Sequence, residues 1–247
     1  MKDLKIFCRV EKKYIIDRRK KEKLLSLMQG RITPDTHGNS TICSLYLDTP
    51  DFRLIRTSLE REPYKEKLRI RSYGETSHGD RVFLEIKKKY KGRVYKRREP
   101  MTLECAKNYV LFGDIPKDTQ IMREIDYAMK LYGNPVPRML VAYEREAYFA
   151  QNEENLRITF DTGVRYRSDG LDLSLGSYGK RIIDDDTVIM EIKTDGAMPL
   201  WLSHIIDETK TYPSRFSKYG RSYMDMIENI TEGEKENVKY LQANSSR

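Results

Sequence analysis

Charged and apolar residues alternate along two neighbouring stretches in the first half of the chain. Cations occupy every second position of residues 67–71, namely Lys67, Arg69 and Arg71, and Leu68 and Ile70 lie between them. Side chains of a strand point alternately to opposite faces of its sheet. The pattern therefore predicts a strand with one basic face and one apolar face, and residues 84–89 repeat it.

A single strand of this kind is typical of an ordinary half-buried sheet with a solvated face, so the repetition carries the argument. In the second stretch Glu85, Lys87 and Lys89 share the charged face. Further β-prone runs occur at residues 6–16, 41–47, 93–99, 140–149, 156–162, 164–167 and 187–194. Turns and short helices separate these runs, which favours an antiparallel sheet of about eight strands.

Other segments have the apolar periodicity of amphipathic helices. Asp17 is a good N-cap for the first of these helices, and Gly30 ends that helix. Thr49 and Pro50 begin the second helix. The remaining helices are expected at residues 102–112, 118–132, 199–206 and about 217–230. Residues 231–247 are polar and lack periodicity, so we expect one domain over residues 1–230 and a disordered tail.

The amphipathic helices need an apolar surface to cover, and each strand offers one. The economical arrangement places the helices outside and curls the sheet so that its charged faces line a central channel. We therefore predict an α+β fold, an antiparallel β tunnel barrel with a charged interior and helices packed outside. This inverts the usual small barrel, whose interior is filled with apolar side chains.

The charge balance of the chain indicates what kind of partner it binds. The 247 residues include 46 Lys and Arg against 38 Asp and Glu, a formal net charge of +8. Such an excess indicates a polyanionic partner, such as nucleic acid, an acidic membrane surface or a phosphorylated small molecule. A chain of phosphates fits the interior of a small barrel better than double-stranded nucleic acid, which is too wide.

Most predicted strands contribute cations to the channel, namely Lys13, Arg69, Arg71, Lys87, Lys96, Arg145, Arg157 and Lys193. Crowded like charges repel one another, and a polyanion together with acids such as Glu11, Glu85 and Glu191 would offset that cost. Arginine forks hold phosphate oxygens in pairs, and lysines act as point charges. The strand at residues 93–99 sorts its charges less cleanly, so its register stays open.

Several classes of protein find no support in the sequence. Cys8, Cys43 and Cys105 form no CxxC pair, which argues against a disulfide framework and for a reducing compartment. No stretch approaches the roughly 20 apolar residues of a membrane span, so we expect a cytoplasmic protein without a transmembrane segment. The three histidines have no metal-binding spacing, and no P-loop, GxGxxG or GxSxG motif occurs.

Six motifs occur in the order of a known family. They are LYLDT at residues 45–49, KLRIRSYG at 67–74, FLEIK at 83–87, YER at 143–145, MEIK at 190–193 and FSKY at 216–219. Over about residues 5–228 the chain resembles the VTC domain, the catalytic module of polyphosphate polymerases. That domain belongs to the CYTH-like triphosphate tunnel metalloenzymes, which are antiparallel tunnel barrels.

The resemblance implies a role for particular residues. Those implied to be catalytic are Lys13, Arg69, Arg71, Lys87, Lys193 and Lys218. Those implied to bind phosphate are Lys96, Arg98, Arg145, Arg157, Arg215 and Ser217. Glu191 is implied to hold a divalent metal, Mn²⁺ or Mg²⁺, and Glu11 and Glu85 are further candidates. Arg215 stands where a lysine of the family motif is expected, which keeps the charge and changes the geometry.

The implied activity is the ATP-driven, metal-dependent growth of inorganic polyphosphate, with ATP or another nucleoside triphosphate held in the tunnel. Hydrolytic relatives typically begin with Glu-x-Glu-x-Lys, whereas this chain has Arg9, Glu11 and Lys13. The missing carboxylate favours a polymerase. A triphosphatase or other nucleotide-processing enzyme, and a noncatalytic polyphosphate-binding module, remain the alternatives. Membrane docking and regulation would come from separate partners.

Overall fold

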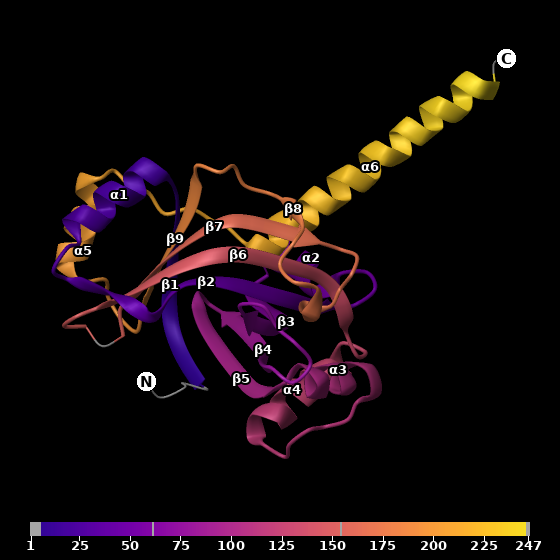
Figure 1. Ribbon diagram of the computed structural model, residues 1–247, viewed down its shortest axis with the longest axis horizontal. Coiled ribbons are helices and arrows are strands. Elements are labelled where there is room, and N and C mark those ends of the chain that lie inside the picture. Colours follow the sequence, from indigo (N-terminus) through magenta and orange to yellow (C-terminus); the bar gives the residue numbers. More distant parts are fainter. Residues whose placement is uncertain (1–5, 61, 154, 246–247) are drawn as a thin grey trace.

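The computed structural model describes residues 6–60, 62–153 and 155–245 and has an α+β fold (Figure 1). The strands are β1 (Ile6–Asp17), β2 (Ile32–Asp48), β3 (Tyr64–Tyr73), β4 (Arg81–Tyr90), β5 (Arg93–Thr102), β6 (Val136–Ala150), β7 (Arg157–Arg167), β8 (Lys180–Arg181) and β9 (Thr187–Thr194). The helices are α1 (Arg18–Leu27), α2 (Arg53–Leu59), α3 (Leu103–Phe112), α4 (Gln120–Leu131), α5 (Leu200–Glu208) and α6 (Lys218–Ser245), with a 3₁₀ turn at Leu173–Leu175.

The strands form one antiparallel sheet in the order β6-β2-β3-β4-β5-β1-β9-β7-β8. β6 pairs with β7 as well as with β2, so the two sides of this series are joined. The first strand, β1, lies between β5 and β9. The large antiparallel sheet predicted from the alternating pattern is therefore confirmed.

Two apolar clusters cover the outward side of the alternating strands. Leu68, Ile70, Leu84 and Ile86 of β3 and β4 are buried against α3 and α4, which contribute residues such as Ile125. A fully buried Leu or Ile side chain stabilises the fold by roughly 1.5–3 kcal/mol. The apolar positions of the sequence pattern thus account for how α3 and α4 are held to the sheet.

The second cluster lies under α1 and α5. Its buried members include Tyr14 of β1, Leu24 of α1, Phe160 of β7 and Ile192 of β9. The side chain of Asp17 accepts a hydrogen bond from the backbone N–H of Lys20, which is the expected N-cap of α1. Helices therefore pack on the apolar positions of the strands at both places, as predicted.

A third cluster joins the beginning of α6 to the other face of β2, β6 and β7. Tyr219 stacks on Tyr46 with ring centroids 4.2 Å apart, and its hydroxyl donates to Asp48, 2.8 Å away. Asp48 also accepts from the backbone N–H groups of Leu54 and Ile55 in α2. One buried carboxylate thus fixes both helices against the sheet.

Several element boundaries differ from the expected ones. β2 begins at Ile32 and crosses the expected loop, with a register shift between Pro34 and Asn39. The two strands expected at residues 156–162 and 164–167 are one strand, because Gly163 adopts φ +58° within it. α2 begins at Arg53, after Phe52 in the left-handed region.

The segment that we expected to be a disordered tail is helical as far as Ser245, because α6 continues through it. Figure 1 shows α6 leaving the body of the molecule with the C-terminus at its far end. The polar composition suggested disorder, but Glu, Lys, Gln and Leu are strong helix formers. Polarity without an apolar stripe therefore did not exclude a helix here.

The structure bears on two further expectations, the absence of a disulfide framework and the absence of a transmembrane segment. Cys43 and Cys105 are free thiols, and the side chain of Cys8 lies outside the described part of the chain. Within the described ranges, no helix has both the length and the apolar character that a membrane span requires.

Candidate functional site

The predicted site residues of the strands lie on one face of the sheet, here called the charged face. Directly opposed residues of neighbouring strands share a face. The opposed pairs are Arg69–Glu85, Glu85–Arg98, Lys87–Lys96, Glu11–Lys193, Lys13–Glu191, Arg157–Lys193 and Arg145–Asp161. The uncertain register at residues 93–99 is settled by these pairs, because Lys96 and Arg98 both lie on the charged face.

Glu85 is surrounded by three cations, and together these residues form the Glu85 cluster (Glu85, Arg69, Arg71 and Lys96). The Arg69 guanidinium lies 2.7 Å from the Glu85 carboxylate, Lys96 contacts its other oxygen, and Arg71 lies 3.9 Å away. Glu85 is fully buried. Burial alone would raise its pKa, but the positive charges of Lys96 and Arg69 outweigh burial and hold the pKa well below its usual value.

Two further acids of the charged face, Glu11 and Glu191, each pair with one lysine. Glu11 accepts from Lys87 at 2.7 Å, and Glu191 lies 2.8 Å from Lys193. Burial, the largest single effect, would raise the pKa of each acid, but the positive charges of several neighbouring cations together outweigh it and lower the pKa. Glu11 and Glu191 lie diagonally across β1 and β9, because Glu11 is opposite Lys193 and Glu191 is opposite Lys13.

Lys193 is 6% exposed, and its pKa differs from the ordinary value of a lysine. Burial, opposed by the carboxylate of Glu191 and reinforced by Arg145, lowers its pKa to about 7. A nearby phosphate anion would favour the charged form.

Asp161 connects the strands to α6. Arg145 holds it with two hydrogen bonds, of 2.6 and 2.7 Å, and Lys218 of α6 contacts the same carboxylate. Both cations also lie over the ring of Tyr143, at 5.1 and 4.4 Å from its centroid. Lys218 is thereby placed among the strand cations, as expected from the sequence motif.

The segment 214–218 crosses one end of the charged face on its way to α6. The backbone N–H of Ser214 donates to the Lys13 carbonyl, and Lys13 Nζ donates to the Phe216 carbonyl at 2.9 Å. Lys67 Nζ donates to the Ser217 hydroxyl, also at 2.9 Å. This segment therefore contacts β1 and β3 and, through Lys218, β7.

The remaining predicted residues are Arg157, Arg98 and Arg215. Arg157 pairs with Asp35 at 2.7 Å. Arg98 lies over the Phe83 ring at 4.6 Å from its centroid. Arg215 is exposed in the segment before α6, apart from the buried cations.

Sequence reasoning left two residues out of the predicted set. Lys67 faces Lys87 across β3 and β4, so it shares the charged face. Asp161 is fully buried as the partner of Arg145 and Lys218. The alternation that selected Arg69 and Arg71 also marks Lys67, whereas nothing in the sequence marked Asp161 as the counter-charge of a distant helix.

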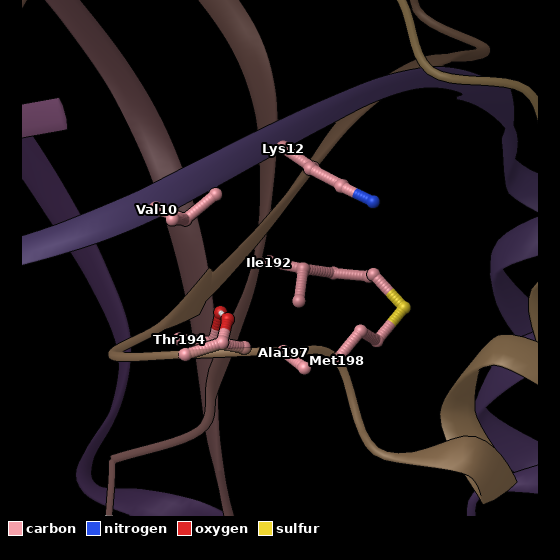
Figure 2. Close-up of a pocket in the computed structure, with 7 residues that line it drawn as sticks. Val10, Lys12, Ile192, Thr194, Ala197 and Met198 are labelled. Atoms are coloured by element: carbon pink, nitrogen blue, oxygen red, sulfur yellow. Dashed lines mark hydrogen bonds between the residues drawn. The ribbon is translucent and has the colours of Figure 1, made fainter. Parts of the chain in front are cut away.

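Two pockets lie on the opposite, apolar face. One, of about 100 Å³, lies beside Val10 and Lys12 of β1 and Ile192 of β9, and Figure 2 shows their side chains on the same side of the two strands. The other, of about 260 Å³, lies between α3 and the sheet, with the ion pair of Lys107 and Asp172 at its edge. Neither pocket contains a predicted site residue.

Comparisons with solved structures agree with the fold. A putative adenylate cyclase from Bacillus halodurans is similar with a TM-score of 0.56 at 11% identity, covering 87% of this chain and 96% of that one. A putative adenylyl cyclase from Hippeastrum, described as having a dominant triphosphatase activity, is similar with a TM-score of 0.51 at 14% identity, covering 87% and 95%. At such low identity these similarities concern the fold alone.

A search of curated proteins found no match. The model of the family described as the VTC domain matches residues 8–227, which is most of the chain. The resemblance read from six short motifs is therefore confirmed, and this chain belongs to the VTC domain family.

Proposed function

We propose that this chain is an ATP-dependent polyphosphate polymerase, a phosphotransferase that extends inorganic polyphosphate with the γ-phosphate of ATP. The observation that carries the proposal is the gathering of buried and partly buried cations from β1, β3, β4, β5, β6, β9 and α6 on one face, where they outnumber the acids among them. A linear polyanion supplies the missing negative charge. Membership in the VTC domain family supports the same activity.

The charged face would enclose a tunnel. Its closure is supported by the pairing of β6 with both β2 and β7, since this pairing joins the two sides of the strand series. A tunnel walled by low-dielectric protein strengthens each contact between a cation and a phosphate oxygen. It also explains why so many charged side chains are buried.

Within this tunnel the arginines would hold phosphate oxygens in pairs, and the lysines would act as point charges. Arg71 is suited to this task, since its guanidinium contacts the hydroxyls of Ser44 and Tyr143 and approaches Glu85 only to 3.9 Å. A bound phosphate would favour the charged form of Lys193, because the anion offsets the effect of burial.

The residues present fit a divalent cation. Glu11 and Glu191 are neighbouring carboxylates, and Thr159, opposite Glu191, buries a hydroxyl that has no hydrogen-bond partner within the described residues. No group of three or more His, Cys, Asp and Glu suited to a metal is found in the described ranges. Mg²⁺ is commonly held by one or two carboxylates together with phosphate oxygens, so Glu191 and Glu11 would hold Mg²⁺ or Mn²⁺ with the substrate.

Glu85 is less suited to the metal, because its oxygens already contact Arg69 and Lys96 and it is fully buried. We assign it to the support of the neighbouring cations instead. A bound divalent metal would neutralise part of the charge on the triphosphate.

In the proposed reaction a terminal oxygen of the polyphosphate chain attacks the γ-phosphorus of ATP. A new P–O bond forms, the bond from the γ-phosphorus to the β–γ bridging oxygen breaks, and ADP leaves with that oxygen. Phosphoryl transfer depends mainly on positioning and charge neutralisation. The end of a polyphosphate chain is already ionised, so the arrangement needs no general base.

The test is incubation of the purified protein with ATP and Mn²⁺, followed by analysis of nucleotides and phosphate. ADP together with long phosphate polymers is the expected result. Free phosphate without polymer would replace the proposal with a triphosphatase. Tight polyphosphate binding without turnover would replace it with a binding module.

A further inference from the structure

Lysines oppose lysines at two positions of β3 and β4 that are neighbours on the charged face. Lys65 lies opposite Lys89, and Lys67 lies opposite Lys87. Like charges directly opposite each other across an antiparallel pair are destabilising. These four residues are here called the lysine ladder (Lys65, Lys67, Lys87 and Lys89).

The protein itself neutralises the lysine ladder only in part. Lys87 has an acid partner, Glu11. Lys67 donates only to the neutral hydroxyl of Ser217, and neither Lys67 nor Lys89 has an acid within ion-pair distance in the part of the chain that the structure describes. Burial and the positive charges of the neighbouring cations lower the pKa of Lys67 well below its usual value.

The lysine ladder also runs from the Glu85 cluster toward solvent. Arg69 of the Glu85 cluster lies next to Lys67 on the same face of β3. Lys67 is partly exposed, and Lys89 is exposed at the β4–β5 hairpin. The side chain of Lys87 is 27% exposed. The charged face is therefore accessible at this end, beside the segment 214–218 that covers part of it.

We propose that the lysine ladder is an extension subsite, which holds the part of a linear polyphosphate that continues beyond the phosphates bound near Arg69. This proposal rests on the proposed function, since it takes linear polyphosphate as the ligand. Each ladder lysine offers a point charge to successive phosphates of a long chain. Lys65, which lies opposite Lys89, is four residues from Arg69 on β3, roughly 13 Å along a strand, and this span exceeds the length of a triphosphate.

The test compares two variants of adjacent lysines, Lys89→Ala and Lys88→Ala. Lys88 lies on the opposite face, where it pairs with Glu66 at 3.4 Å, so it is a matched control. Binding of tripolyphosphate and of long-chain polyphosphate is measured by titration at several salt concentrations. Exposed charge pairs are worth up to about 1 kcal/mol, so we expect Lys89→Ala to lower the ratio of long-chain to tripolyphosphate affinity about 2- to 5-fold.

The salt dependence gives a second measure. Removal of one phosphate contact should reduce the slope of log affinity against log salt for the long chain by about 0.7. Lys88→Ala should leave this slope and the affinity ratio unchanged. Equal effects of the two variants, or no effect of Lys89→Ala, would overturn the extension subsite while the proposed function stands. Failure of the unmodified protein to bind either ligand would instead count against the proposed function.

Discussion

The Glu85 cluster and the lysine ladder lie side by side on the same face, and they differ in how their cations are paired with acids. In the Glu85 cluster a fully buried carboxylate is shared by Arg69, Arg71 and Lys96. In the lysine ladder, cations oppose cations, and among the described residues Lys67 donates a hydrogen bond to the hydroxyl of Ser217 and to no acid. One region supplies most of its own counter-charge, whereas in the other the described residues place no acid within ion-pair distance of Lys67 or Lys89.

This difference separates two uses of a buried charge. A cation held by an internal acid is fixed in position and adds to the integrity of the fold, because removal of its partner leaves an uncompensated charge. A cation without an acid is costly to the free protein and gains its partner only with an anionic ligand. The following substitutions test whether the two regions divide stability and binding in this way.

Glu85→Gln should have the largest effect on stability. The change leaves Arg69 and Lys96 buried without their shared counter-charge, and loss of one partner of a buried ion pair costs about 3–5 kcal/mol. Urea unfolding would measure the loss. Glu124→Gln, which removes the partly exposed partner of Arg97, serves as the control and should cost less than about 1 kcal/mol. A similar small cost for Glu85→Gln would show that the cluster does not depend on its acid.

Glu191→Gln should abolish metal-dependent turnover while polyphosphate binding persists or strengthens. The variant removes a proposed metal ligand and one negative charge from a site that binds anions. The loss of activity should reach about 100-fold, the scale of losing one strong electrostatic contact in a transition state. ATP turnover with Mn²⁺ gives the measurement. Unchanged turnover would move the metal elsewhere, and Glu146→Gln, on the opposite face beside Lys21, is the control.

Lys67→Met should separate binding from stability. Because no acid within the described ranges pairs with Lys67, its loss should leave the free energy of unfolding unchanged or slightly higher, while polyphosphate affinity falls about tenfold, as for one charge-assisted hydrogen bond. Chemical denaturation and ligand titration on the same preparation measure both. A clear loss of stability would show that Lys67 belongs with the structural cations of the Glu85 cluster.

The smallest expected effect is a pH dependence of stability. The pKa of Lys67 in the folded protein is lowered, first by burial and then by neighbouring cations. Between that lowered pKa and the ordinary value of 10.5, the unfolded chain binds more protons, so stability should rise with pH. Thermal unfolding of the unmodified protein and of Lys67→Met between pH 7 and pH 9 would isolate the contribution. An identical pH trend in both would contradict it.

The alternation of residue types predicted much of the site because a strand's geometry is local. Arg69, Arg71 and Lys87 were placed on one face from spacing alone, and the register of β3 and β4 agrees. The strand at residues 93–99 was ambiguous, because both of its faces carry charge. Pairing with β4 resolved it, by setting Lys96 opposite Lys87.

Contacts that depend on long-range packing were not predictable. The burial of Asp161 between Arg145 and Lys218 requires α6 to arrive against β7. The course of segment 214–218, with Ser217 against Lys67, follows from the stacking of Tyr219 on Tyr46. No periodicity within either segment predicts these contacts.

The position of β1 between β5 and β9 governs how the molecule can assemble. Lys13 lies opposite Glu191, so the first strand cannot complete its pairing on the β9 side until most of the chain has been synthesised. Contacts between residues so distant in sequence slow folding, because closing the long loop costs entropy before the strand pairing contributes stabilising free energy. We therefore expect slow folding that is completed only after β9 has been synthesised, and until then an incompletely paired β1 would be the site most prone to aggregation.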